Sequence, residues 1–70
     1  MEYKLMLREL RTKQGLSQRK VADQVGVVPS AVAQWELGLN DPSLSNVVAL
    51  ADLLSCSLDQ LVVRGGRTSA

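Results

Sequence analysis

The segment QRKVADQVGVVPSAVAQW, residues Gln18 to Trp35, decides the fold. Ala22 lies four residues before Gly26 and ten before Val32. Two helices that cross steeply need a small side chain where they touch, which Ala22 provides. The bend between them needs a residue that adopts positive φ, and Gly26 does so without a steric penalty. Val32 and Trp35 then close the wedge, so the segment predicts two short helices joined by a tight turn.

Apolar residues recur at helical spacing on both sides of this segment. The first helix has an apolar stripe of Tyr3, Met6, Leu7 and Leu10, and the fourth has one of Val47, Leu50, Ala51 and Leu54. Ser17, Ser43 and Ser57 cap the second, fourth and fifth helices, and Gly15, Gly26 and Gly38 end the first three. The third helix runs from about Pro29 to Leu37. Since no alternating pattern or hairpin turn signals strands, the sequence predicts an all-α fold, a compact five-helix bundle.

The C-terminal part predicts a short last helix followed by a tail. Ser57 and Gln60 have the spacing of a capping box, and this helix is expected to bury Leu58 and Leu61. From Arg64 onward, RGGRTSA offers nothing to bury. We therefore expect one domain over residues 1–63 and a disordered tail over 64–70.

Composition excludes several classes of function. With one cysteine and no histidine, the chain cannot form an internal disulfide, a thiol–imidazole zinc site or a histidine-based triad. Cys56 is expected to act as a small buried apolar residue. No group of side chains has the spacing of a catalytic centre, so no enzyme activity, metal or cofactor is expected. No run approaches the ~20 apolar residues of a membrane helix and no secretory signal is visible, so we expect a cytoplasmic protein.

The charge distribution favours an anionic partner only weakly. The net charge is +1. The first 37 residues contain six basic and four acidic side chains, whereas residues 38–59 contain three acidic and no basic ones. Positive charge therefore gathers in the N-terminal half, as is typical of nucleic-acid-binding proteins, which usually have a stronger excess.

Between about Tyr3 and Val62 the chain contains five motifs: LRELRTKQGLSQ, VADQVGV, QWELG, DPSL and LADLLSCSLDQL. Together they resemble the Cro and phage-repressor family of helix-turn-helix proteins, whose fold is the lambda-repressor-like DNA-binding domain. The resemblance implies that the third helix enters the major groove of DNA and that the second lies across the sugar-phosphate backbone.

The resemblance also implies roles for individual residues. Gln18 and Arg19 are expected at the phosphate backbone, and Asn40 at a further backbone contact. The groove-facing positions are Val28, Pro29, Ser30, Ala31 and Gln34. The positions expected to hold the motif together are Arg11, Ala22, Gly26, Val32, Trp35 and Glu36, with Arg11 and Glu36 forming a salt bridge between the first and third helices.

The chain departs from the family at both ends of the third helix. Val28 is a poor N-cap, although Pro29 suits the first helical position. Alternatively, Ser30 is the cap, which would start the helix later and withdraw it from the bases. Leu37 and Leu39 stand where relatives often have asparagine, arginine or lysine, which should weaken phosphate binding and its salt dependence.

The expected reading of DNA rests on few polar groups. Gln34 can pair with adenine through two hydrogen bonds, and Ser30 can bond to several bases. Pro29, Ala31 and Val28 can contact thymine methyl groups. One strong base contact per subunit gives too little sequence specificity, so we expect a homodimer on a palindromic operator. Its interface is expected around the fourth and fifth helices, because the chain has apolar residues beyond the needs of a small core: Leu5, Met6, Leu53, Val62 and Val63.

The sequence thus predicts a repressor-like transcriptional regulator of prokaryotic or phage type that binds double-stranded DNA. An antitoxin that represses its own operon is a variant of this function. A different alternative is a protein-interaction module, in which Val28, Leu37 and Leu39 form an apolar patch for an unknown protein partner.

Overall fold

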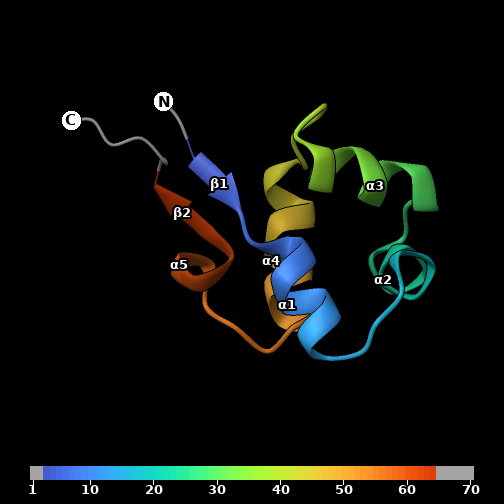
Figure 1. Cartoon of the computed structure of the whole chain (residues 1–70), viewed down its shortest axis with the longest axis horizontal. Helices are drawn as coiled ribbons and strands as arrows, with labels where there is room; N and C mark the ends of the chain where they lie inside the picture. Colours follow the sequence, from blue (N-terminus) through green and yellow to red (C-terminus); the bar gives the residue numbers. More distant parts are fainter. Residues whose placement is uncertain (1–2, 65–70) are drawn as a thin grey trace.

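The computed structural model describes residues 3–64. Along the chain, these residues form a short strand, five helices and a second short strand (Figure 1). The order is β1 (Tyr3–Leu5), α1 (Leu7–Lys13), α2 (Gln18–Val25), α3 (Pro29–Leu37), α4 (Leu44–Leu53), α5 (Leu58–Leu61) and β2 (Val62–Arg64). Helices α1 and α4 occupy the middle of the molecule, with α2 and α3 on one side and the two strands on the other (Figure 1).

The helix boundaries follow the predicted caps. The hydroxyl of Ser17 accepts a hydrogen bond from the backbone N–H of Lys20 at 2.9 Å, and Ser43 caps α4 in the same way. At the start of α5, Ser57 and Gln60 form the predicted capping box. Each cap satisfies a backbone donor that the first turn leaves unpaired. The expected starts of these three helices are therefore confirmed.

Two short strands, one at the expected start of the first helix and one directly after the last helix, were not predicted. β1 pairs with β2 in antiparallel register, with Tyr3 opposite Arg64 and Leu5 opposite Val62. The prediction that Tyr3 and Met6 belong to the first helix is wrong, because Tyr3 lies in β1 and Met6 is the N-cap of α1. The prediction of an all-α fold is confirmed for the five helices and is wrong for these two strands.

The physical reason is that this pairing joins segments about sixty residues apart in three-residue strands, which are too short to show alternation. Arg64, expected to begin the tail, is the last residue of β2. The rest of the predicted tail, residues 65–70, lies outside the described residues.

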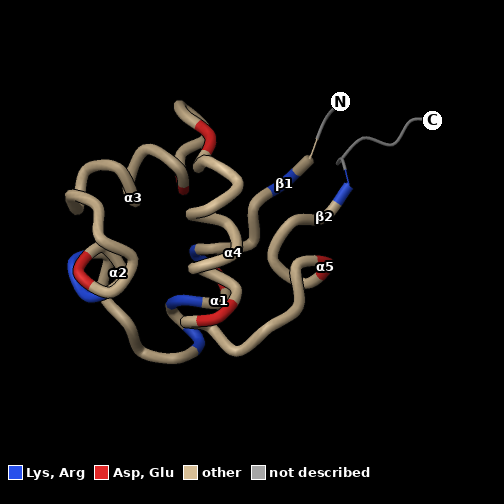
Figure 2. The backbone as a smooth tube through the Cα atoms, turned by 180° about the vertical axis from the view of Figure 1, so that it is seen from behind, with Lys and Arg blue, Asp and Glu red and all other residues tan. Residues whose placement is uncertain are grey.

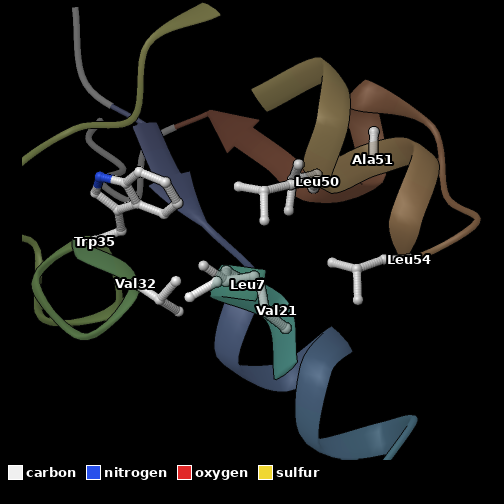
Figure 3. Packing of buried hydrophobic residues seen from close by; sticks show 9 residues of the cluster. Leu7, Val21, Val32, Trp35, Leu50, Ala51 and Leu54 are labelled. Carbon is white, nitrogen blue, oxygen red and sulfur yellow. The ribbon is translucent and has the colours of Figure 1, made fainter. Parts of the chain in front are cut away.

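The core gathers one face of every helix (Figure 3). Its buried members are Leu7, Val21, Ala22, Val32, Trp35, Leu50, Ala51, Leu54 and Leu61. Leu5 and Val62 from the paired strands pack against it. Burying these side chains supplies the main favourable term in folding.

Leu58 departs from its prediction, because it is 46% exposed instead of buried. Helix α5 has only four residues, and Leu61 takes its core-facing position. Leu58 lines a surface groove instead. Cys56 is half-buried, where the sequence predicted a buried residue; it packs against the core, and burial raises the pKa of its thiol.

None of the helices in residues 3–64 combines the length and the apolarity that crossing a membrane requires. Over the same residues, no three His, Cys, Asp or Glu side chains gather as a possible metal site.

Candidate nucleic-acid interface

Helices α2 and α3 meet at the elbow that the sequence predicts. Ala22 is fully buried, and its carbonyl accepts hydrogen bonds from the N–H groups of Gly26 and Val27 at 2.8 and 3.0 Å. Gly26 has φ 87°, and a Cβ placed there would meet no atom within 4 Å. The need for glycine is therefore conformational, since L-residues rarely adopt this left-handed backbone.

Helix α3 begins at Pro29 and not later. Val28 is its N-cap, with extended backbone and no side-chain hydrogen bond, and the N–H of Ala31 donates to the carbonyl of Val28 at 3.0 Å. The alternative in which Ser30 caps the helix is therefore wrong. Ser30 lies in the first turn and is exposed.

The two faces of α3 differ in burial. Val32 and Trp35 point into the core, where they meet Leu7 and Val21 (Figure 3). Of the residues predicted to face the groove, Ser30 and Gln34 lie on the opposite, exposed face, and Val28 and Pro29 are exposed at the start of the helix. Ala31 is instead half-buried and packs against the core.

An ion pair fixes α3 to α1. Arg11 donates to both carboxylate oxygens of Glu36, from Nε to Oε2 at 2.6 Å and from Nη2 to Oε1 at 3.0 Å. Its Nη1 donates to the carbonyl of Leu16 at 2.8 Å. Both side chains are largely buried, with 12% and 4% exposed. This two-point geometry is the strong form of a carboxylate–guanidinium contact.

Gln18 joins the same network. Its Nε2 donates to Oε1 of Glu36 at 3.0 Å, so the side chain spans from the start of α2 to α3. A carboxamide nitrogen carries two hydrogens, which leaves the second able to reach a phosphate. The backbone N–H groups of Gln18 and Arg19, in the first turn of α2, have no partner within the helix and suit an anion.

The pKa of Glu36 lies below its ordinary value of 4.5. Burial, the largest influence, raises the pKa, but the hydrogen bonds from Arg11 and Gln18 and the charge of Arg11 outweigh it. Conversely, the hydrogen bond to Glu36 raises the pKa of Arg11. Each partner therefore stabilises the charged form of the other.

We expect the ion pair to make stability depend on acidity. Because the pKa of Glu36 is lower in the folded chain than in the unfolded chain, its contribution is complete above about pH 4.5 and is lost as the pH falls through the folded-state pKa. Denaturant unfolding across this range should show a shallower decline for Glu36→Gln, which lacks the titrating group. Equal pH slopes in the two proteins would contradict this expectation.

Positive charge lies on α2 and not on α3. Arg19 and Lys20 are exposed in the first turn of α2, whereas α3 contains no Lys or Arg (Figure 2). At the end of α3, Leu37 and Leu39 are 69% and 68% exposed where a basic residue would strengthen the attraction of phosphates. The charges that could contact the sugar-phosphate backbone of DNA therefore lie on α2, whereas the exposed face of α3 is nearly uncharged.

Gln34 and Asn40 form a contact that the sequence reasoning missed. Asn40 Nδ2 donates a hydrogen bond to Gln34 Oε1 across the end of α3. The signal that could have indicated it is the glycine at position 38, because a left-handed C-terminal residue reverses the chain and returns the following residues to the last turn.

Comparisons with known proteins agree with this geometry. The family described as Helix-turn-helix matches residues 7–61. The HTH-type transcriptional regulator AnsR of Bacillus subtilis (strain 168) is 40% identical over 58 residues, which cover 83% of this chain and 50% of AnsR.

Two solved structures are similar over most of the domain. The phage P22 c2 repressor, solved in complex with a synthetic operator, has a TM-score of 0.72 at 36% identity, covering 76% of this chain and 80% of that chain. The restriction-modification controller protein C.AhdI from Aeromonas hydrophila has a TM-score of 0.73 at 41% identity, covering 77% and 82%. The chain spans only 30% to 52% of the length of the curated relatives BcrR, YonR and AnsR.

Proposed function

The chain belongs to the helix-turn-helix family, of the Cro and phage-repressor type, and on this premise we propose that it is a transcriptional regulator that binds double-stranded DNA through α2 and α3. The observation that carries the proposal is the division of α3, which buries Val32 and Trp35 and exposes Ser30 and Gln34. The relatives BcrR and AnsR are named as a transcriptional activator and a transcriptional regulator, and the phage P22 protein C2 is named as a repressor.

In the proposed complex, α2 positions the domain on the DNA backbone. The first-turn N–H groups of Gln18 and Arg19 and the Arg19 side chain contact phosphates, which fixes orientation without reading sequence. The network of Gln18, Glu36 and Arg11 holds α2, α3 and α1 in one arrangement, so these contacts place α3 in the groove.

Helix α3 reads the base edges in the major groove. Ser30 and Gln34 supply the hydrogen bonds, and Val28, Pro29 and Ala31 contact thymine methyl groups. A good two-point hydrogen-bonded contact gives about 1 to 3 kcal/mol of discrimination. Useful specificity therefore calls for two copies, whose α3 helices would lie about 34 Å apart on a palindromic operator.

We place the homodimer interface on the face formed by β1, α4 and α5. Of the residues expected to be surplus, Leu5, Leu53 and Val62 instead pack against the core. The exposed apolar residues on this face are Tyr3, Leu44, Val48 and Leu58. Three of them, Tyr3, Leu44 and Leu58, line a groove of about 390 Å³ together with Leu5, Pro42, Val47 and Val62. Sedimentation of Leu44→Ser should give a weaker dimer than the wild type, and a chain that stays monomeric even on DNA would contradict the dimer.

The alternative of a protein-interaction module rests on three exposed apolar side chains that are spread along α3. Val28 and Leu37 stand at opposite ends of α3, about 14 Å apart along the helix axis at 1.5 Å per residue, and Leu39 lies beside Leu37 in sequence. The relatives named as transcriptional regulators favour DNA binding over this alternative. An antitoxin role is compatible with the proposed function, and no contact in residues 3–64 favours it. We also propose that the chain is not an enzyme and acts in the cytoplasm.

Binding to a labelled random duplex tests the proposal. We expect measurable affinity at low salt that falls as salt rises, with a logarithmic slope of about −1 to −2 per subunit for the two exposed charges of α2. Arg19→Ala should reduce the magnitude of that slope by about 1. Arg64→Ala, at the end of β2 away from α3, is the control and should leave it unchanged. No binding at low salt would favour a protein partner instead.

A further inference from the structure

We propose that Asn40 sets which base Gln34 reads, by holding the Gln34 carboxamide with its nitrogen toward the groove. This inference rests on the proposed function, because it presumes that α3 lies against base edges. Asn40 is a positioning residue here, since it acts through Gln34 and not by its own contact with a base.

The end of α3 places the two side chains together. Gly38 is left-handed, with φ 77°, and its N–H donates to the carbonyl of Trp35 at 3.2 Å. The next N–H, of Leu39, donates to the carbonyl of Gln34 at 2.9 Å. These bonds fold the chain back over the last turn, so the backbone itself directs Asn40 to Gln34.

The hydrogen bond between the side chains has a direction. Asn40 Nδ2 donates and Gln34 Oε1 accepts. A carboxamide has a donor end and an acceptor end, and turning it by 180° exchanges them. Because this bond turns Oε1 toward Asn40, the Gln34 Nε2 group, with its two hydrogens, is the end left to face a ligand.

This orientation changes the preferred base. A free glutamine pairs with adenine by accepting from N6 and donating to N7, which uses both ends of the amide. With the oxygen engaged by Asn40, Nε2 can donate to N7 and O6 of guanine, whose major-groove edge presents acceptors alone. The pair therefore favours guanine over adenine at the position that Gln34 contacts.

Selection of bound sequences from a random duplex pool tests the inference, using the full chain. The position read by Gln34 is the one whose preference disappears in Gln34→Ala. At that position we expect the wild type to favour guanine over adenine by roughly tenfold, the scale of one good base contact. In Asn40→Ala, where the carboxamide turns freely, this ratio should fall to about two or below.

Asn40→Asp provides the sharper variant. A carboxylate only accepts hydrogen bonds, so Gln34 would donate Nε2 to it and present its oxygen to the groove. The preference should reverse, toward the donor groups of adenine or cytosine. Asn46→Asp, in the first turn of α4, adds the same charge elsewhere and should leave guanine preferred. Circular dichroism spectra that match the wild type would show that each variant is folded.

The outcomes separate the two proposals. If the wild type enriches no sequence at all, the proposed function fails and this inference fails with it. If sequences are enriched but adenine stands at the Gln34 position, or if Asn40→Asp leaves guanine preferred there, the inference alone is overturned. It is likewise overturned if Gln34→Ala removes the preference at no position.

Discussion

Replacing Trp35 with alanine is expected to lower the free energy of unfolding by about 3 to 5 kcal/mol, the usual cost of deleting a large buried aromatic side chain. Trp35 is 7% exposed and packs in the cluster that joins α3 to the rest of the core. A chain of this size has a total stability of about 3 to 10 kcal/mol. The variant should therefore be largely unfolded or close to it.

Denaturant unfolding followed by circular dichroism measures this change. Tryptophan fluorescence would not serve, because Trp35 is the single tryptophan of the chain and the variant removes it. Leu37→Ala is the matched control, because Leu37 lies two residues further along α3 and is 69% exposed. Its effect should stay within about 0.5 kcal/mol. A Trp35→Ala variant as stable as this control would show that α3 is not anchored through Trp35.

The second large effect is expected from Arg11→Met, which should cost about 3 to 5 kcal/mol because it leaves a buried carboxylate without its partner. The Glu36 side chain is only 4% exposed, and Arg11 supplies two of the three side-chain hydrogen bonds described for it. Thermal or denaturant unfolding at neutral pH measures the loss. The loss of stability should be smaller in acid, where protonation of Glu36 removes the unpaired charge.

The double variant Arg11→Met with Glu36→Met separates loss of the pair from loss of a partner. Apolar replacement of both ends of a buried ion pair is often nearly neutral, so the double variant should regain most of the stability that Arg11→Met loses. Lys13→Met, at an exposed position of the same helix, controls for charge removal and should change stability by about 0.5 kcal/mol at most. A double variant less stable than Arg11→Met would contradict the role given to the pair.

Much of the fold could be predicted because its signals are local. Helix α3 has the bounds expected from Pro29 and Gly38, and Ser57 with Gln60 forms the capping box that their spacing indicates. The positions of Ala22 and Gly26 at the elbow could be predicted, because small size and tolerance of positive φ are properties of single residues. The resemblance added the Arg11–Glu36 pair, which no local pattern would indicate.

The features that could not be predicted depend on partners distant in sequence or on exact placement. Strands β1 and β2 stabilise each other across about sixty residues, and neither shows a strand pattern alone. Leu58 fits an apolar helical spacing, yet a four-residue helix has room for only one core-facing leucine, Leu61. The bond between Gln34 and Asn40 depends on how the chain turns at Gly38.

The most direct test of the central claim is to follow the backbone amide resonances of the labelled chain while duplex DNA is added. We predict the largest shifts at the start of α2, at Gln18 and Arg19, and on the exposed side of α3, at Ser30 and Gln34. Shifts in β1, α4 and α5 are expected only where the DNA brings two copies together at the proposed dimer interface. Largest shifts along β1, β2 and α5, with α3 unchanged, would show that DNA does not meet this chain through the helix that we assign to the groove.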